Sequence, residues 1–239
     1  MEQLGNKVAF ITGGSKGIGY GVAVELARAG VKVAISSRHG EEAEKAAAEI
    51  SSNYAGEVIG MEVDVRDFNQ IEKATNDILE KWGQLDIVIA NAGIGHFGSV
   101  EDLTIEQWQQ TIDTNLSGVF YTVKAAIPAL KRSKGYLITI SSLAGTNFFA
   151  GGSAYNASKF GVTGFTQAAM LDLRDYGIKV TTIMPGSVAT YFNDHEPSQK
   201  DAWKIQKEDI GELVIDLLRM NQRALPSKIE IRPTTPPKK

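Results

Sequence analysis

The sequence has no cysteine among its 239 residues. This absence excludes a disulfide framework, a thiolate metal site and a cysteine nucleophile. The three histidines, His39, His96 and His195, do not fall at the spacing of metal ligands, so no metal site is expected.

Long apolar runs are also absent. No stretch is long enough to span a bilayer, and the polar residues 1–7 lead directly into a short apolar run without forming a basic and apolar leader. We therefore expect a cytoplasmic protein with no membrane partner.

Neither sign of charge is in large excess. The net charge of −3 provides no general attraction for nucleic acid or an anionic membrane, and neither partner is expected. A hydrophobic content of 43% is enough for a sizeable core. We find no linker composition or internal repeat, so we predict one domain over residues 1–239.

Short β-branched apolar runs alternate with longer amphipathic segments along the chain. The runs are almost continuously apolar, which is typical of parallel strands covered on both faces. This alternation predicts an α/β fold, a doubly wound parallel sheet of about seven strands with helices on both faces and ligands at the carboxyl ends of the strands. The expected strands are 8–12, 31–36, 58–63, 87–91, 136–141, 180–184 and 229–231, the expected helices 18–29, 41–51, 68–82, 105–130, 153–176 and 209–220, and 232–239 is expected to be an extended tail.

The predicted helix 153–176 has small and apolar residues on more than one face. One face would cover the sheet, and a second apolar face needs another partner. We expect a second subunit, in a homodimer or homotetramer, although a neighbouring helix of the same chain is the alternative.

Glycines gather between the first strand and the first helix, in the pattern Gly13-x-x-x-Gly17-x-Gly19. Glycines at such a turn let backbone N–H groups approach a pyrophosphate at the positive end of a helix. The spacing differs from the commoner dinucleotide pattern and lacks the Lys-Ser/Thr ending of an NTP loop. The turn predicts a dinucleotide site.

The second strand ends in Ser36-Ser37-Arg38, without the acidic residue that accepts the ribose hydroxyls of NAD. Arg38 can hold a 2′-phosphate through its planar guanidinium, and Lys16 in the glycine turn can add a second positive charge. We therefore expect NADP(H) rather than NAD(H). The alternative is that both are surface cations at loop ends.

Tyr155 and Lys159 lie four residues apart near the start of a predicted helix. Their side chains would share one helical face, and a fixed cation beside a phenol favours the phenolate and lowers the phenol pKa. The pair suits proton transfer, although Tyr and Lys at this spacing also occur on solvated helices.

Four motifs appear in order: the glycine turn, Asn91-Ala92-Gly93, Ser141-Ser142 and Tyr155-x-x-x-Lys159. Over residues 7–190 the chain thereby resembles the short-chain dehydrogenase/reductase family, which has a Rossmann-like fold. The resemblance implies that Tyr155 is the general acid for carbonyl reduction, and that Lys159 binds the nicotinamide ribose and lowers the Tyr155 pKa.

By the same resemblance, Ser142 polarises the carbonyl and Asn115 holds a water that leads protons to Lys159. Two hydroxyl donors would stabilise the negative charge that develops on the carbonyl oxygen. The expected cofactor-binding residues are Gly13, Ser15, Lys16, Gly17, Ile18, Gly19, Ser37, Arg38, Asp64, Val65, Asn91, Ala92, Gly93, Tyr155, Lys159, Pro185, Gly186, Val188 and Thr190.

Substrate recognition is expected in 95–97, 143–152 and the short substrate loop 186–207. These segments carry Phe97, Phe148, Phe149, Tyr191 and Phe192, of which we expect two or three to wall an apolar or planar carbonyl or alcohol substrate. His96 is expected to be a plain loop histidine.

Two other functions stay open. A 3-oxoacyl-carrier-protein reductase is one, although the C-terminal segment lacks the expected Gly-Gly. The other is a non-catalytic NADP(H)-binding sensor or scaffold.

Overall fold

The computed structural model describes residues 4–236 of the chain. Its sheet has seven parallel strands in the order β3-β2-β1-β4-β5-β6-β7, which confirms the predicted α/β class and strand number. The strands are β1 (Val8–Thr12), β2 (Lys32–Ser37), β3 (Val58–Glu62), β4 (Ile87–Ala90), β5 (Tyr136–Ile140), β6 (Lys179–Pro185) and β7 (Lys228–Ile231).

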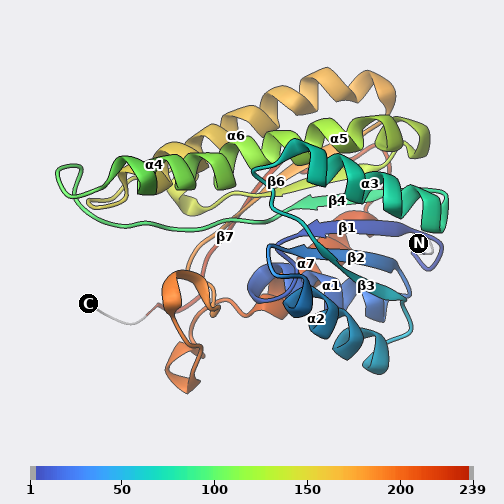
Figure 1. Cartoon of the computed structure of the whole chain (residues 1–239), viewed down its shortest axis with the longest axis horizontal. Helices are drawn as coiled ribbons and strands as arrows, with labels where there is room; N and C mark the ends of the chain where they lie inside the picture. The colour runs from blue at the N-terminus through green and yellow to red at the C-terminus, as the bar shows by residue number, and fades with distance from the viewer. Residues whose placement is uncertain (1–3, 237–239) are drawn as a thin grey trace.

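Helices cover both faces of the sheet, as Figure 1 shows. Helices α1, α2 and α7 pack on one face, whereas α3, α5 and α6 pack on the other, and each side has its own cluster of buried apolar residues. The central strands β1, β4 and β5 are buried on both sides, which explains their mostly apolar sequence, whereas the edge strands β3 and β7 are partly exposed. The helices are α1 (Gly17–Arg28), α2 (Gly40–Asn53), α3 (Phe68–Trp82), α4 (Ile105–Ile112), α5 (Gly118–Ser133), α6 (Ser153–Leu173) and α7 (Lys207–Arg219).

The helix predicted over 105–130 is present, but it contains a π turn that the prediction did not include. The segment forms α4, a π-helical turn at Asp113–Ser117 and α5, with the Gly118 N–H donating to Asp113 O five residues earlier. A π turn inserts one residue without changing the apolar periodicity enough to be read from sequence. The helix also continues to Ser133, where Lys134 adopts a left-handed conformation with φ of 49°.

The first strands of the two halves, β1 and β4, are neighbours, and the chain winds outward from them in both directions. This switch in strand order opens a crevice at the carboxyl ends of β1 and β4, where doubly wound folds bind ligands. The expected tail begins beside this edge: Gly186 N–H donates to Ile231 O at 2.8 Å, and residues 232–236 form no helix or strand. The predicted tail also includes residues 237–239, which lie outside the described residues.

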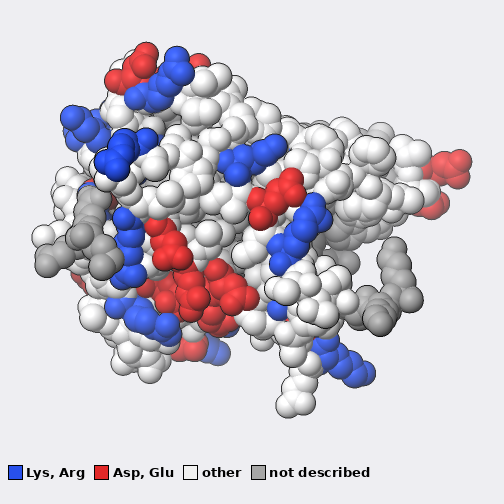
Figure 2. All heavy atoms as spheres, turned by 180° about the vertical axis from the view of Figure 1, so that it is seen from behind, with Lys and Arg blue, Asp and Glu red and all other residues white. Residues whose placement is uncertain are grey.

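Surface charge is mixed. Figure 2 shows Lys and Arg interspersed with Asp and Glu on the back of the molecule, with one group of acidic side chains near its middle. Among residues 4–236 there is no helix with the length and apolar character needed to cross a bilayer.

Candidate active site

The glycine turn lies between β1 and α1, at the crevice. Gly13 and Gly17 have φ of +66° and +61°, a conformation that favours glycine. A Cβ on Gly19 would lie 2.4 Å from Gly13 O, so this position also requires glycine. The start of α1 has no side-chain cap and no acidic residue in its first turn. Its N–H groups therefore suit an anion.

Asn91 holds this turn in place. Its amide donates to Thr12 O and to Gly13 O, both at 2.9 Å, while the Thr12 hydroxyl accepts from the Asn91 N–H at 3.1 Å and from the Ala92 N–H at 3.3 Å. The sequence analysis missed Thr12. A hydroxyl at the end of a buried strand beside the glycine turn is the signal that would have identified it.

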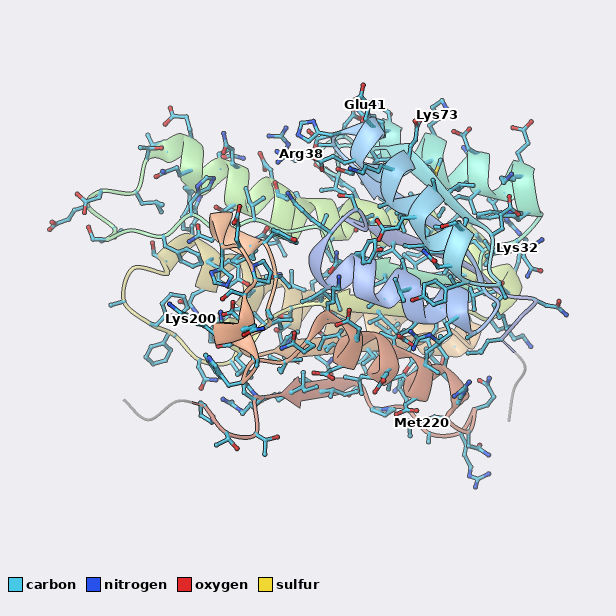
Figure 3. All side chains as sticks on the ribbon, turned by 90° about the horizontal axis from the view of Figure 1, so that it is seen from below. Lys32, Arg38, Glu41, Lys73, Lys200 and Met220 are labelled. Carbon is cyan, nitrogen blue, oxygen red and sulfur yellow. The ribbon has the colours of Figure 1, made fainter. Side chains whose placement is uncertain are left out.

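Arg38 follows β2 at the opposite end of the crevice, beside Glu41 (Figure 3). It is exposed, and within residues 4–236 it makes no hydrogen bond or ion pair, although Glu41, Glu42 and Glu62 line the same hollow. The neighbouring Ser37 hydroxyl accepts from the His39 N–H at 3.2 Å. The guanidinium is thus available to an external anion in an otherwise acidic setting.

Asp64 and Val65 follow β3. Asp64 accepts three side-chain hydrogen bonds from Arg66, and these hold the pKa of its carboxyl below the usual range. Val65 is buried beside Gly118, where an added Cβ would meet Val65 Cγ2 at 2.8 Å. Asp64 therefore presents a neutralised ion pair rather than a free carboxylate to the crevice.

Tyr155 and Lys159 lie on the first turns of α6, next to the end of β5. The Lys159 ammonium is buried, donates to Ile140 O at 2.9 Å and lies 5.7 Å from the centre of the Tyr155 ring. The Ser142 hydroxyl accepts from the Ala144 N–H at 3.1 Å, which leaves its own proton available for donation. The three predicted catalytic side chains Ser142, Tyr155 and Lys159 therefore meet at one place.

The electrostatics of the pair differ from expectation. Burial raises the pKa of the Tyr155 hydroxyl, and the Ser142 side chain opposes this only in part. Burial lowers the pKa of Lys159 to about 8. The predicted lowering of the Tyr155 pKa by Lys159 is therefore not seen, because loss of hydration dominates both groups.

Asn115 sits on the π turn and faces the same crevice. Its amide donates to Ile94 O at 2.8 Å and to the Ser158 hydroxyl at 3.1 Å, and its oxygen accepts from the Ile94 N–H at 2.8 Å. A Cβ on Gly93 would lie 3.3 Å from Asn115 Oδ1 and 3.6 Å from Lys159 Nζ. Asn115 thus connects the segment after β4 to the catalytic helix.

The predicted residues after β6 close the other side of the crevice. A Cβ on Gly17 would lie 3.5 Å from the Thr190 side chain, so Thr190 faces the glycine turn. Gly186 packs against Leu143 and Pro233, and Val188 pairs with Ile205. Pro185 ends β6 and is buried.

Three of the five predicted aromatic residues form one connected group with Tyr155, two of them in contact with its ring. The ring centres of Phe97 and Phe192 lie 5.4 Å and 5.6 Å from that of Tyr155, and 6.2 Å from each other. Phe149 lies 6.0 Å from Phe97. Phe148 is 86% exposed and Tyr191 55% exposed. His96 contacts Gln110 Oε1 at 3.2 Å, outside this group.

The segment that carries Phe192 is held by a buried carboxylate. Asp201 pairs with Lys204 at 2.6 Å and His195 at 2.9 Å, and it accepts from the Ser198 N–H at 2.9 Å. These partners hold the pKa of Asp201 below its usual range. Two backbone hydrogen bonds join the ends of the segment, since the Ala189 N–H donates to Ile205 O at 2.9 Å and the Ile205 N–H donates to Ser187 O at 3.1 Å.

Other supporting residues were also missed. Asn156 donates to Ala144 O and Asn147 O, both at 2.8 Å, and so fixes the loop after Ser142. The Ser141 hydroxyl donates to Lys159 O at 3.0 Å. Both lie beside predicted catalytic residues in the sequence, which is the signal that was available. In the part of the chain described, no three His, Cys, Asp or Glu side chains form a metal-binding group.

The crevice therefore combines a glycine cradle, an uncapped helix start, an available arginine and a phenol beside an ammonium. These features fit a nicotinamide dinucleotide, with its pyrophosphate at the glycine turn.

The family model for short chain dehydrogenases matches residues 7–201. The chain is 39% identical over 194 residues to trans-4-hydroxycyclohexanecarboxylate dehydrogenase of Sinomonas cyclohexanicum, covering 79% of this chain and 75% of the relative. It is 31% identical over 236 residues to sepiapterin reductase of Chlorobaculum tepidum, covering 95% and 96%.

Among solved structures, the chain is similar to an alcohol dehydrogenase from the archaeon Thermococcus sibiricus complexed with 5-hydroxy-NADP. The TM-score is 0.91 at 30% identity, covering 98% of this chain and 99% of that one. A 3-ketoacyl-(acyl-carrier-protein) reductase from Brucella melitensis complexed with NADH gives a TM-score of 0.88 at 25% identity, covering 97% and 98%.

Proposed function

Since the chain belongs to the short-chain dehydrogenase family, a family of nicotinamide-dependent oxidoreductases, we propose that it is an NADP(H)-dependent carbonyl reductase that also oxidises the corresponding alcohol. The observation that carries this proposal is the convergence of Ser142, Tyr155 and Lys159 beside the glycine cradle.

The nicotinamide, when bound, supplies the hydride for the carbonyl carbon. The protein acts on the oxygen. Ser142 and Tyr155 donate hydrogen bonds to this atom as negative charge develops there, and the proton of the Tyr155 hydroxyl then moves to it. Burial raises the pKa of Tyr155, so its hydroxyl is protonated at neutral pH, as the donor role in reduction requires.

Lys159 and Asn115 support this transfer. Lys159 is buried, anchored on Ile140 O and close to Asn115, so its ammonium is positioned to bind a ribose hydroxyl and to return a proton to Tyr155. Asn115 keeps the Ile94 backbone against α6 and, in our proposal, orders a water next to Lys159.

The preference for NADPH rests on Arg38, with Lys16 as a second exposed cation. A hydrogen bond to a charged group contributes roughly 1.5–3 kcal/mol, which is about a ten- to hundredfold difference in affinity. Arg38→Asp should therefore shift the NADPH-to-NADH affinity ratio by about that factor towards NADH. Arg132→Asp, an exposed residue near the end of α5, is the control. Tighter NADH than NADPH binding by the unaltered protein in a fluorescence titration would contradict the preference.

Reduction of the 3-oxo group of a 3-oxoacyl chain on a carrier protein is the second candidate, supported by the likeness to the Brucella enzyme. The decisive test of function is a panel of carbonyl compounds and 3-oxoacyl thioesters, assayed by loss of NADPH absorbance. No turnover of any carbonyl compound with either nicotinamide, despite measured cofactor binding, would favour a non-catalytic sensor instead.

A further inference from the structure

We propose that the substrate is a compact, uncharged carbonyl compound with one apolar ring, and that Phe192 selects it by occupying the place of that ring before binding. This inference rests on the proposed carbonyl reductase function. It concerns the group of rings formed by Phe97, Phe149, Tyr155 and Phe192, which we call the aromatic gate.

The aromatic gate is closed over the catalytic phenol. Phe97, Phe192 and Tyr155 touch one another, with all three centre-to-centre distances between 5.4 Å and 6.2 Å. Aromatic rings at these separations are in direct contact, so no further ring fits between them. A substrate ring that reaches Tyr155 from this side must therefore displace one of the phenylalanines.

Phe192 is the ring best placed to move. Phe97 contacts three rings, those of Phe149, Tyr155 and Phe192, whereas Phe192 contacts two and lies in the segment between β6 and α7. The next residue, Asn193, has a φ of +57°, a left-handed conformation that asparagine adopts readily. The Asp201 contacts hold the rest of the loop, which confines the movement to the tip.

The size of the substrate follows from this exchange. When Phe192 leaves, Phe97 and Tyr155 lose apolar contacts that a six-membered ring can replace, and the buried apolar area is then restored. A small acyclic ketone replaces only part of this buried apolar area. A fused bicyclic ketone exceeds the space that one phenyl ring vacates.

The charge of the substrate follows from the loops around the aromatic gate. Segments 93–99, 142–152 and 186–196 contain no Lys or Arg, but they include Asp194 and Glu196. On the loop between β6 and α7, Lys204 is already paired with Asp201. A substrate carboxylate would find no lysine or arginine in these three segments to replace its hydration, which is unfavourable. The same reasoning disfavours the phosphate-bearing arm of an acyl carrier.

The test compares four ketones: cyclohexanone, 4-oxocyclohexanecarboxylate, acetone and 2-decalone. For the unaltered protein we expect kcat/KM for cyclohexanone to exceed that for each of the others by at least about tenfold, the factor that 1.4 kcal/mol represents. Equal or better turnover of the carboxylate or of 2-decalone would overturn the proposal, while the carbonyl reductase function would stand. Failure on all ketones would remove both.

The role of Phe192 is tested with Phe192→Ala and the matched control Phe148→Ala, which truncates a neighbouring ring that is 86% exposed. Because Phe192→Ala removes the ring that a substrate has to displace and leaves a wider space, it should lower KM for 2-decalone much more than for cyclohexanone, and so reduce the ratio of kcat/KM values by about tenfold or more. Calorimetric titration of the two corresponding alcohols into the NADP⁺ complex should show the same change in relative affinity. If Phe192→Ala and Phe148→Ala give the same ratios as the unaltered protein, Phe192 does not select the substrate.

Discussion

Burial dominates the chemistry of individual residues at the site. It raises the Tyr155 pKa and lowers the Lys159 pKa to about 8, so both shifts favour the neutral forms. A neutral phenol is the proton donor that reduction needs, and an amine with a lowered pKa exchanges protons more readily near neutral pH. The two residues are thus suited to a proton relay, in which Tyr155 gives its proton to the substrate and Lys159 then returns a proton to Tyr155.

Tyr155→Phe removes only the hydroxyl. We expect turnover to fall by roughly 10²- to 10⁴-fold, the usual contribution of a positioned proton donor, with NADPH affinity little changed. Turnover is measured by stopped-flow or steady-state NADPH absorbance, and NADPH affinity by a fluorescence titration. Tyr176→Phe, at an exposed tyrosine outside the site, is the control. Unchanged turnover in Tyr155→Phe would contradict the assigned role.

The lowered Lys159 pKa also predicts how stability depends on pH. Between about pH 8 and the ordinary lysine pKa of 10.5, the unfolded chain binds more protons at this residue than the folded one. The free energy of unfolding should therefore increase with pH across this window, by on the order of 2–3 kcal/mol from this residue. Urea unfolding at pH 7.5 and pH 10 measures this change in the free energy of unfolding. Lys159→Met should lack this increase, and an equal pH response in both proteins would exclude the buried lysine as its source.

At the scale of secondary-structure elements, two irregular segments position residues of the site. The π turn at Asp113–Ser117 places Asn115 against Ile94, and the loop between β6 and α7 brings Phe192 over Tyr155. Both are local departures from regular structure at a functional position, where such departures are typical.

Asp201→Asn tests the loop as an element. The amide keeps the shape of the carboxylate but leaves Lys204, which is largely buried, without its counter-ion. We expect a several-fold rise in KM for ketones, a smaller change in kcat, and faster hydrogen exchange of amides in 190–205. Glu196→Gln, on the same loop but exposed, should change none of these. Retained protection and KM in Asp201→Asn would show that the carboxylate does not position the loop.

The sequence predicted the strands and most helices because their apolar pattern is strong. It did not predict the π turn inside the helix 105–130, because this turn adds one residue without a change in composition. The positions of Ser142, Tyr155 and Lys159 followed from motif spacing. Their pKa shifts did not, because these depend on how deeply the packed helix and sheet bury each group. Thr12 and Asp201 were missed for a related reason, since their roles arise from contacts with residues distant in sequence or with an irregular loop.

At the scale of the whole molecule, α6 leaves an apolar face uncovered. Val162, Thr166 and Ala169 face the interior, but Ala157, Phe160, Gly164, Ala168 and Leu171 form an exposed row along the outside of the same helix. A Cβ on Gly164 would meet no atom within 4 Å. No neighbouring helix within residues 4–236 covers this row, which supports the proposal of a homo-oligomer.

Leu171→Glu tests this proposal, because it places a charge within the exposed apolar row, where a subunit contact would bury it. We expect the unaltered chain to elute as a dimer or tetramer in size-exclusion chromatography with light scattering, and Leu171→Glu to shift it towards the monomer. Met220→Glu, an apolar-to-acidic change at the end of α7 (Figure 3), is the control. A monomeric unaltered protein at micromolar concentration would contradict the proposal.

The chain leaves the sheet next to the proposed nicotinamide position, since Ile231 and Pro233 both contact Gly186. Leu4 and Lys7 instead lie near the amino end of β1, on the far side of the fold (Figure 1). An affinity tag or a fluorescent label is therefore best attached before the first residue, and an immobilised preparation coupled through that end would keep its catalytic opening directed away from the support.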